Sequence, residues 1–125
     1  MGHTVLIVDD SEFMRVMLRE IIEDMGWIVE AEAADGHEAV AAWQQSRPDL
    51  VLMDINMPNL DGTGALTRII AAEPEARVVM IAALGQKDQV LTAIKAGARD
   101  FVIKPFDHER VQETLSRLVE IDAPA

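Results

Sequence analysis

The chain contains no cysteine, so it has no disulfide, no thiolate zinc site and no cysteine nucleophile, which fits a reducing compartment. Long apolar stretches are also missing. The longest apolar run, residues 78–84, has seven residues, far fewer than the ~18 that a membrane-spanning helix needs. The N-terminal residues lack the basic start and the length of a signal peptide. We therefore expect a cytoplasmic protein that is neither secreted nor embedded in a membrane.

Basic residues are scarce: 22 acidic residues stand against 11 Lys and Arg, which gives a formal net charge of −11. This charge repels a phosphate backbone and disfavours nucleic acid as a partner. Cations and basic protein surfaces are the natural counterparts. Acidity of this degree also serves simply to keep a small protein soluble, so the net charge does not choose between these explanations.

The length of 125 residues, with 50% hydrophobic and 26% charged residues, is typical of one globular domain. We expect this domain to cover residues 1–121 and to be followed by a short tail at 122–125. No linker, low-complexity tract, second domain or internal repeat is visible in the sequence.

Short runs rich in β-branched residues alternate with segments of helical spacing. The predicted strands are residues 4–8, 28–31, 50–53, 78–81 and 101–103. Their apolar residues are continuous rather than alternating, which is typical of a parallel sheet covered by helices on both faces.

Helix signals lie between these runs. The expected helices begin after Ser11, at the capping-box spacing Asp35 to Glu38, near Gly64, before Val90 and after Asp107. In the first of them, Phe13, Met17, Ile21 and Met25 are spaced four residues apart, and we expect this stripe to face the core.

Charged residues gather where the predicted strands end. Asp9 and Asp10 follow the first strand, Asp54 follows the third and Lys104 follows the fifth. Ligands of open parallel sheets bind at the carboxyl ends of the strands, and carboxylates that meet there repel one another unless a cation neutralises them. An all-oxygen set with open water positions suits Mg²⁺ better than Ca²⁺, and the carbonyl of Asn56 is a further candidate ligand.

A carboxylate in such a cluster can act as a nucleophile that accepts a phosphoryl group. Asp54 is the best acceptor because it stands alone on its strand, whereas Asp9 and Asp10 are adjacent and suited to share the ion. The metal and Lys104, acting as a point charge, would then screen the charge of the phosphoryl group.

The motifs VLIVDD, MDINMP, DG and KPF, at residues 5–10, 53–58, 61–62 and 104–106, together resemble the response-regulator receiver family over nearly the whole chain. Residues 11–15 and 84–86 are most similar to CheY-like, single-domain chemotaxis regulators. The resemblance implies a flavodoxin-like, doubly wound (βα)5 fold of the α/β class. It also implies the strand order 2-1-3-4-5, of which CheY is itself a standard example, so this order is inherited from the family.

The resemblance further implies that Asp54 receives its phosphoryl group from a phosphohistidine of a sensor histidine kinase. Mg²⁺ would be held by Asp10, Asp54, the Asn56 carbonyl and, partly through water, Asp9. Members of the family assist their own phosphorylation and dephosphorylation and are not enzymes in the usual sense, and Asn56 stands where a residue affecting the loss of the phosphoryl group is found.

Lys104 and Ala83 correspond to the phosphoryl-binding positions of the family, and the peptide bond between Lys104 and Pro105 is expected to be cis. Phosphorylation would shift the population between two conformations, read out on the fourth helix, fifth strand and fifth helix. The expected partners are a chemotaxis-type histidine kinase and a flagellar motor switch protein or another protein target, bound by a monomer. The residues expected to flank the contact are Gln86, Lys87, Val90, Leu91 and Lys95.

Two switch positions differ from the usual pattern. Ala82 stands where receivers carry Thr or Ser, so a hydrogen bond to the phosphoryl group, worth ~1.5–3 kcal/mol, is missing. Phe101 stands at the position of the switch aromatic and has no hydroxyl; it is either that switch or a plain core residue of its strand.

Other functions remain open on the sequence. A pseudo-receiver with impaired switching because of Ala82, or a phosphorelay intermediate, would keep the same fold. Residues 59–63 faintly resemble the nucleophile loop of haloacid-dehalogenase phosphatases, with Asp61 as nucleophile, but that loop should directly follow a strand. Ala65 occupies the position where a calcium loop needs Glu, and no phosphate-binding glycine loop is present.

Overall fold

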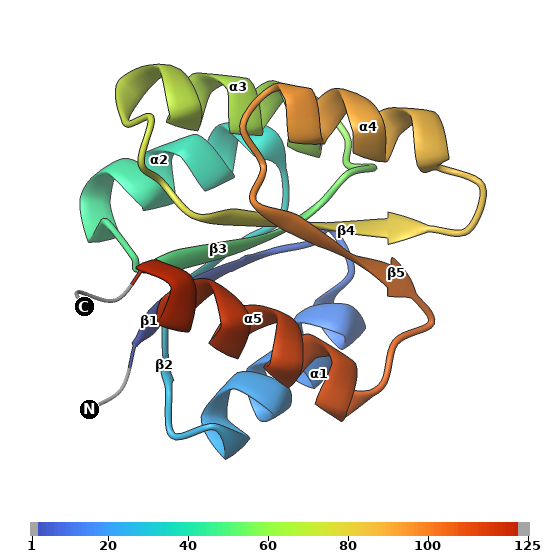
Figure 1. Ribbon diagram of the computed structural model, residues 1–125. Coiled ribbons are helices and arrows are strands. Elements are labelled where there is room, and N and C mark those ends of the chain that lie inside the picture. Colours follow the sequence, from blue (N-terminus) through green and yellow to red (C-terminus); the bar gives the residue numbers. More distant parts are fainter. Residues whose placement is uncertain (1–2, 123–125) are drawn as a thin grey trace.

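The computed structural model describes residues 3–122, in which five strands and five helices alternate (Figure 1). In chain order they are β1 (Thr4–Val8), α1 (Glu12–Asp24), β2 (Ile28–Ala33), α2 (Gly36–Ser46), β3 (Leu50–Asp54), α3 (Gly62–Ala72), β4 (Val78–Ala83), α4 (Lys87–Lys95), β5 (Asp100–Lys104) and α5 (His108–Asp122). Each predicted strand is present, although four of them extend one or two residues beyond the predicted limits. The predicted tail begins inside α5, and residues 123–125 lie outside the described part of the chain.

The strands form one parallel sheet in the order β2-β1-β3-β4-β5, which confirms the expected topology. Helices α1 and α5 cover one face, and α2, α3 and α4 cover the other (Figure 1). On β3, Leu50 and Leu52 pack toward α1 and α5, whereas Val51 and Met53 pack toward the opposite face. Both faces of this strand are buried, which explains its continuous apolar sequence.

Four helices begin at residues whose side chains cap the first turn. Each side-chain oxygen accepts a hydrogen bond of 2.8–3.2 Å from the backbone N–H three residues further on, and these residues are Ser11, Asp35, Asp61 and Asp107. Such a cap stabilises a helix by ~1 kcal/mol. Because Asp61 is one of them, α3 begins at Gly62, two residues before the predicted start.

The predicted inward stripe of α1 is wrong at its first residue. Phe13 is 72% exposed, while the buried residues of this helix are Leu18, Ile21 and Ile22. The reason is geometric: with 3.6 residues per turn, each step of four residues rotates by about 40°, so a stripe from Phe13 to Met25 drifts around the helix by about 120°. Met25 packs against the core, and Phe13 therefore faces solvent.

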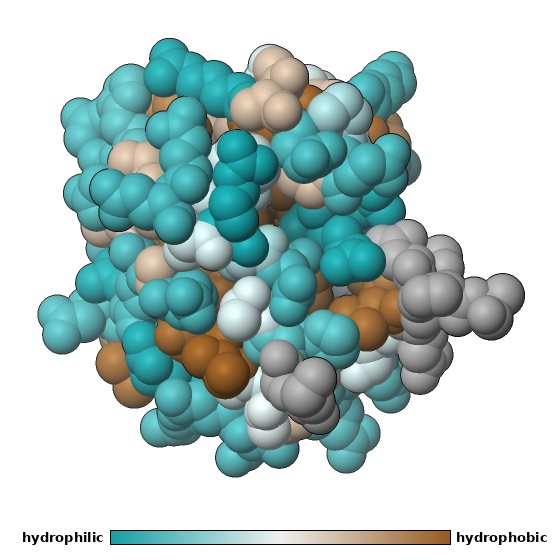
Figure 2. Space-filling model, turned by 90° about the vertical axis from the view of Figure 1, so that its left-hand side faces the viewer, coloured by the Kyte–Doolittle hydropathy of each residue, from teal (hydrophilic) through white to brown (hydrophobic). Residues whose placement is uncertain are grey.

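The two edges of the sheet differ in character. Figure 2 shows the face at the amino ends of the strands, where hydrophilic residues predominate and hydrophobic residues form separate patches. Among residues 3–122, none of the five helices has the length and apolar character needed to cross a bilayer. The clustered acidic residues lie at the other edge, where the strands end.

Candidate functional site

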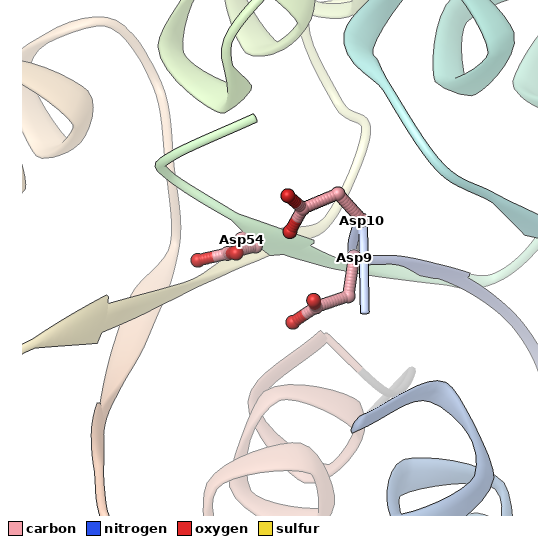
Figure 3. Close-up of side chains that lie close together, drawn as sticks. All are labelled: Asp9, Asp10 and Asp54. Carbon is pink, nitrogen blue, oxygen red and sulfur yellow. The ribbon is translucent and has the colours of Figure 1, made fainter. Parts of the chain in front are cut away.

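The acidic residues predicted to converge do so. Asp9 and Asp10 follow β1, Asp54 is the last residue of β3, and these two strands are neighbours with Val8 in register with Met53. Each of the three carboxylates places an oxygen within 4.8 Å of those of the other two, around a common space (Figure 3). The parallel arrangement of the sheet is what brings residues some 45 positions apart to one edge.

Asp9 is held in place by several contacts. It is 1% exposed, and its Oδ1 accepts a hydrogen bond from the backbone N–H of Ser11 at 2.9 Å. The backbone carbonyl of Asp9 accepts a hydrogen bond of 2.7 Å from Nη1 of Arg15, which also forms an ion pair with Glu32 on β2. The first turn of α1 and the end of β2 thus fix the position of this buried carboxylate.

Lys104 brings a positive charge to the same place. Its Nζ lies 3.4 Å from Oδ2 of Asp9 and 3.5 Å from Oδ2 of Asp54. Lys104 ends β5, which is separated from β3 by β4, so its long side chain reaches across the end of one strand. The peptide bond from Lys104 to Pro105 is cis, as expected. The ammonium therefore touches both buried carboxylates.

Asp54 is destabilised as an anion. Its side chain is in the interior, with the residue only 6% exposed. Burial, followed by the charge of Asp9, raises the pKa of Asp54 to about 6, and the attraction of Lys104 only partly opposes this shift. A cation bound between the carboxylates would relieve both the desolvation and the repulsion.

The donor set fits a hard divalent ion. All three clustered side chains offer carboxylate oxygen, and Asp10 is exposed, which leaves room for water ligands. These properties match Mg²⁺, which binds a few carboxylates and keeps several waters. Asn56 lies two residues beyond the end of β3 and is exposed; its role as a ligand stays a prediction.

Gly62 supports the site and was not identified as part of it from the sequence. Its N–H donates to the carbonyl of Ile55 at 2.8 Å, and a Cβ atom at this position would lie 2.1 Å from the carbonyl oxygen of Asp54. Only glycine allows the start of α3 to approach the end of β3 so closely. The signal in the sequence was the pair Asp61 and Gly62, in which the Asp61 carboxylate caps α3 rather than joining the clustered acids.

The predicted switch residues lie on β4 and β5. Ala82 is fully buried on the face covered by α2, α3 and α4, in register with Ile103. Phe101 is 40% exposed and borders an apolar groove with Leu84 and Leu91, so the interpretation of Phe101 as a plain core residue is wrong. Successive side chains of β5 point to opposite faces of the sheet: Val102 packs on the face covered by α1 and α5, whereas Phe101 and Ile103 border the groove.

The predicted contact residues of α4 divide into two groups. Lys87, Leu91 and Lys95 are exposed, as are Leu84 and Ile94 beside them. Gln86, which precedes the helix, and Val90 are largely buried and contribute only to the floor of the groove. The backbone N–H of Ala83, a predicted phosphoryl-binding residue, donates to Oε1 of Gln86. The sequence offered no signal for this contact, because it depends on the conformation of the β4–α4 turn.

Comparison with known proteins agrees with these features. The family model described as response regulator receiver domain matches residues 5–116. The chain is 47% identical over 118 residues to chemotaxis protein CheY of Thermotoga maritima, covering 94% of this chain and 98% of the relative. It is 46% identical over 117 residues to CheY of Bacillus subtilis, covering 94% and 98%.

Among solved structures, the crystal structure of the CheX–CheY–BeF3–Mg complex from Borrelia burgdorferi matches with a TM-score of 0.87 and 37% identity, covering 98% of this chain and 90% of that one. The strand order, the matched residues and this degree of identity lead to one conclusion: the chain belongs to the response regulator receiver family.

Proposed function

We propose that the protein is a phosphorelay receiver of a chemotaxis system that accepts a phosphoryl group on Asp54 with the help of Mg²⁺. The observation that carries this proposal is the convergence of three carboxylates and the Lys104 ammonium at one edge of the sheet. The relatives from Thermotoga and Bacillus are chemotaxis proteins that the chain matches over almost their full length.

In the proposed reaction, a carboxylate oxygen of Asp54 attacks the phosphorus of a phosphohistidine on a histidine kinase. A new P–O bond forms, the P–N bond breaks, and the histidine nitrogen leaves with the electron pair. Lys104, whose Nζ is 3.5 Å from Oδ2 of Asp54, is placed to pair with a phosphoryl oxygen. Asp9, Asp10 and Asp54, with the Asn56 carbonyl, would hold Mg²⁺, which supplies neutralisation of the charge that develops at the phosphoryl group.

The output is proposed to be a change in the surface of α4, β5 and α5. Exposed apolar side chains already border this surface, including Leu84, Leu91 and Phe101. The partners would be a chemotaxis-type histidine kinase upstream and a flagellar motor switch protein or another protein target downstream, all in the cytoplasm. The receiver would promote its own phosphorylation and dephosphorylation without turning over a free substrate.

The decisive test is incubation with Mg²⁺ and acetyl phosphate, followed by mass spectrometry of the intact protein. We expect a mass gain of one phosphoryl group that is lost in Asp54→Asn and after chelation of Mg²⁺. The matched control is Asp61→Asn, in which Asn can still cap α3, and which should be phosphorylated normally. Phosphorylation that persists in Asp54→Asn but disappears in Asp61→Asn would refute the assignment.

A further inference from the structure

Gln86 makes an unusual contact for a residue that precedes a helix. It occupies the position before α4, yet its side chain does not cap that helix. Instead the side chain folds back, and Oε1 accepts a hydrogen bond of 2.6 Å from the backbone N–H of Ala83. Gln86 is only 9% exposed, so this carboxamide is held in the interior. The turn is closed by Gly85, whose φ of +90° favours glycine.

The Ala83 N–H points toward the acidic site. The carbonyl of Ile81 accepts from the N–H of Ile55 at 3.0 Å, so the peptide groups of Ile81 face β3. Alternate residues of a strand direct their backbone groups to the same neighbour, so the N–H of Ala83 also faces the β3 side. At that level β3 has already ended in Asp54, which is in register with Ile81.

Lys104 gives the same placement from the other side. Ala83 is in register with Lys104, whose ammonium reaches Asp54. The N–H of Ala83 is therefore a donor at the mouth of the site, close to where an oxygen on a phosphorylated Asp54 would lie. In this structure the donor is already satisfied by Gln86.

We infer that Gln86 is a latch: its Oε1 competes with a phosphoryl oxygen for the Ala83 N–H and is released when Asp54 is phosphorylated. This inference rests on the proposed function. The exchange is favourable because a hydrogen bond to an anionic oxygen is about twice as strong as one to a neutral amide oxygen. Gln86 acts through Ala83 and is a positioning residue rather than a catalytic one.

The latch links the site to the output surface without a hydroxyl at position 82. Release frees a buried side chain attached to the residue that immediately precedes α4. The turn from Leu84 to Gln86 joins Ala83 directly to this helix, and it also carries one of the exposed apolar residues of the groove. Occupation of the Ala83 N–H is thereby converted into a change at the start of α4.

The test uses beryllofluoride with Mg²⁺ as the phosphoryl mimic, titrated into wild type and four variants and followed by NMR; Asp54→Asn is the variant that should not bind it. Gln86→Met keeps the size of the side chain but removes the acceptor, and we expect it to bind the mimic about two- to tenfold more tightly than wild type. Gln86→Glu keeps an acceptor and adds a negative charge, so it should bind more weakly than wild type. Gln89→Met, on the exposed side of α4, is the matched control and should bind like wild type.

NMR of the amide groups gives a second readout, first without the mimic and then with it. Without the mimic, the amide hydrogen of Ala83 should exchange faster in Gln86→Met than in wild type, since it has lost its acceptor. In wild type, the side-chain NH₂ resonances of Gln86 should shift when the mimic is added, and Asp54→Asn should abolish this shift.

The two proposals fail in different ways. If wild type does not bind the mimic, or if Asp54→Asn binds it as tightly as wild type does, the proposed function is refuted and the latch with it. If wild type binds the mimic through Asp54 but Gln86→Met binds equally or more weakly, the latch alone is refuted. An Ala83 amide whose exchange is unchanged in Gln86→Met would also overturn it.

Discussion

Replacing Asp54 by Asn should stabilise the protein at neutral pH when no divalent ion is present. The carboxylate is buried beside Asp9, and its pKa is raised to about 6 from an ordinary value of 3.8. The folded state therefore binds the proton more tightly than the unfolded state. The contribution of Asp54 to stability is present below the unfolded pKa and is lost as the pH rises through about 6.

The size of the effect follows from this shift. About two pKa units correspond to ~3 kcal/mol of differential stability. Water at the mouth of the site screens part of the repulsion, and the variant also loses the attraction between Asp54 and Lys104, so we expect a gain of about 1–2 kcal/mol in the free energy of unfolding at pH 7.5. For a domain of this size that is a rise of roughly 3–8 °C in Tm.

The assay is urea and thermal unfolding in EDTA at pH 4.5 and pH 7.5. The gain should be largest at pH 7.5 and clearly smaller at pH 4.5, where Asp54 of the wild type is protonated in the folded state although it is still mostly ionised in the unfolded state. Asp88→Asn, at an exposed position in the first turn of α4, should change stability by less than about 0.5 kcal/mol at either pH.

Magnesium provides the complementary measurement. A ligand that binds only the folded state at ten times its Kd raises the free energy of unfolding by about 1.4 kcal/mol. Wild type should gain this amount from Mg²⁺, and Asp54→Asn should gain much less. The reasoning is refuted if Asp54→Asn is less stable than wild type at pH 7.5 in EDTA, or if its gain is the same at both pH values.

Three further substitutions test other parts of the site. Gly62→Ala places a Cβ 2.1 Å from the carbonyl oxygen of Asp54 and should destabilise the protein by more than about 2 kcal/mol in urea unfolding, whereas Gly26→Ala, strained in φ but sterically open, should cost only ~1 kcal/mol. Lys104→Met should lower the rate of phosphorylation by acetyl phosphate at least ~10-fold, measured by mass spectrometry, because it removes a charge-assisted contact. Position 82 is fully buried, so Ala82→Thr buries a hydroxyl and should lower stability by about 1–2 kcal/mol. The same substitution should raise the affinity for beryllofluoride ~10-fold or more if that hydroxyl reaches the phosphoryl oxygen. An unchanged affinity would show that position 82 does not face the site.

Much of the fold followed from local chemistry. The central strands could be predicted because both of their faces are buried. The starts of α1, α2 and α5 could be predicted because a capping side chain precedes each of these helices. The convergence of Asp9 and Asp54 followed from the rule that parallel strands end at one edge. The neighbour order of the strands did not follow from local pattern, because apolar strands carry no mark of which partner they pair with; it came from the family.

The errors arise at residues whose burial depends on the direction in which the side chain points. Phe13 was expected inside because four-residue spacing suggests a straight stripe, but the helix repeat turns it outward. On α4, Val90 is buried and its neighbour Leu91 is exposed, although both are apolar and adjacent in sequence. The contact of Gln86 with Ala83 required the backbone conformation at Gly85, which no periodicity encodes.

The charge of the site links the proposed binding of a cation to the proposed phosphoryl transfer. Three carboxylates and one ammonium give the cluster a formal charge of about −2, and conversion of one carboxylate into an acyl phosphate adds about one further negative charge. Without a divalent ion, the incoming group would therefore meet a repulsive site that already penalises the ionised form of its acceptor. A bound cation would reverse both effects, because it would favour the anion of Asp54, the proposed nucleophile, and reduce the repulsion of the phosphoryl oxygens. The order of events that this favours is ion first and phosphoryl group second, with the Ala83 N–H exchanging its acceptor only after the new oxygens are in place.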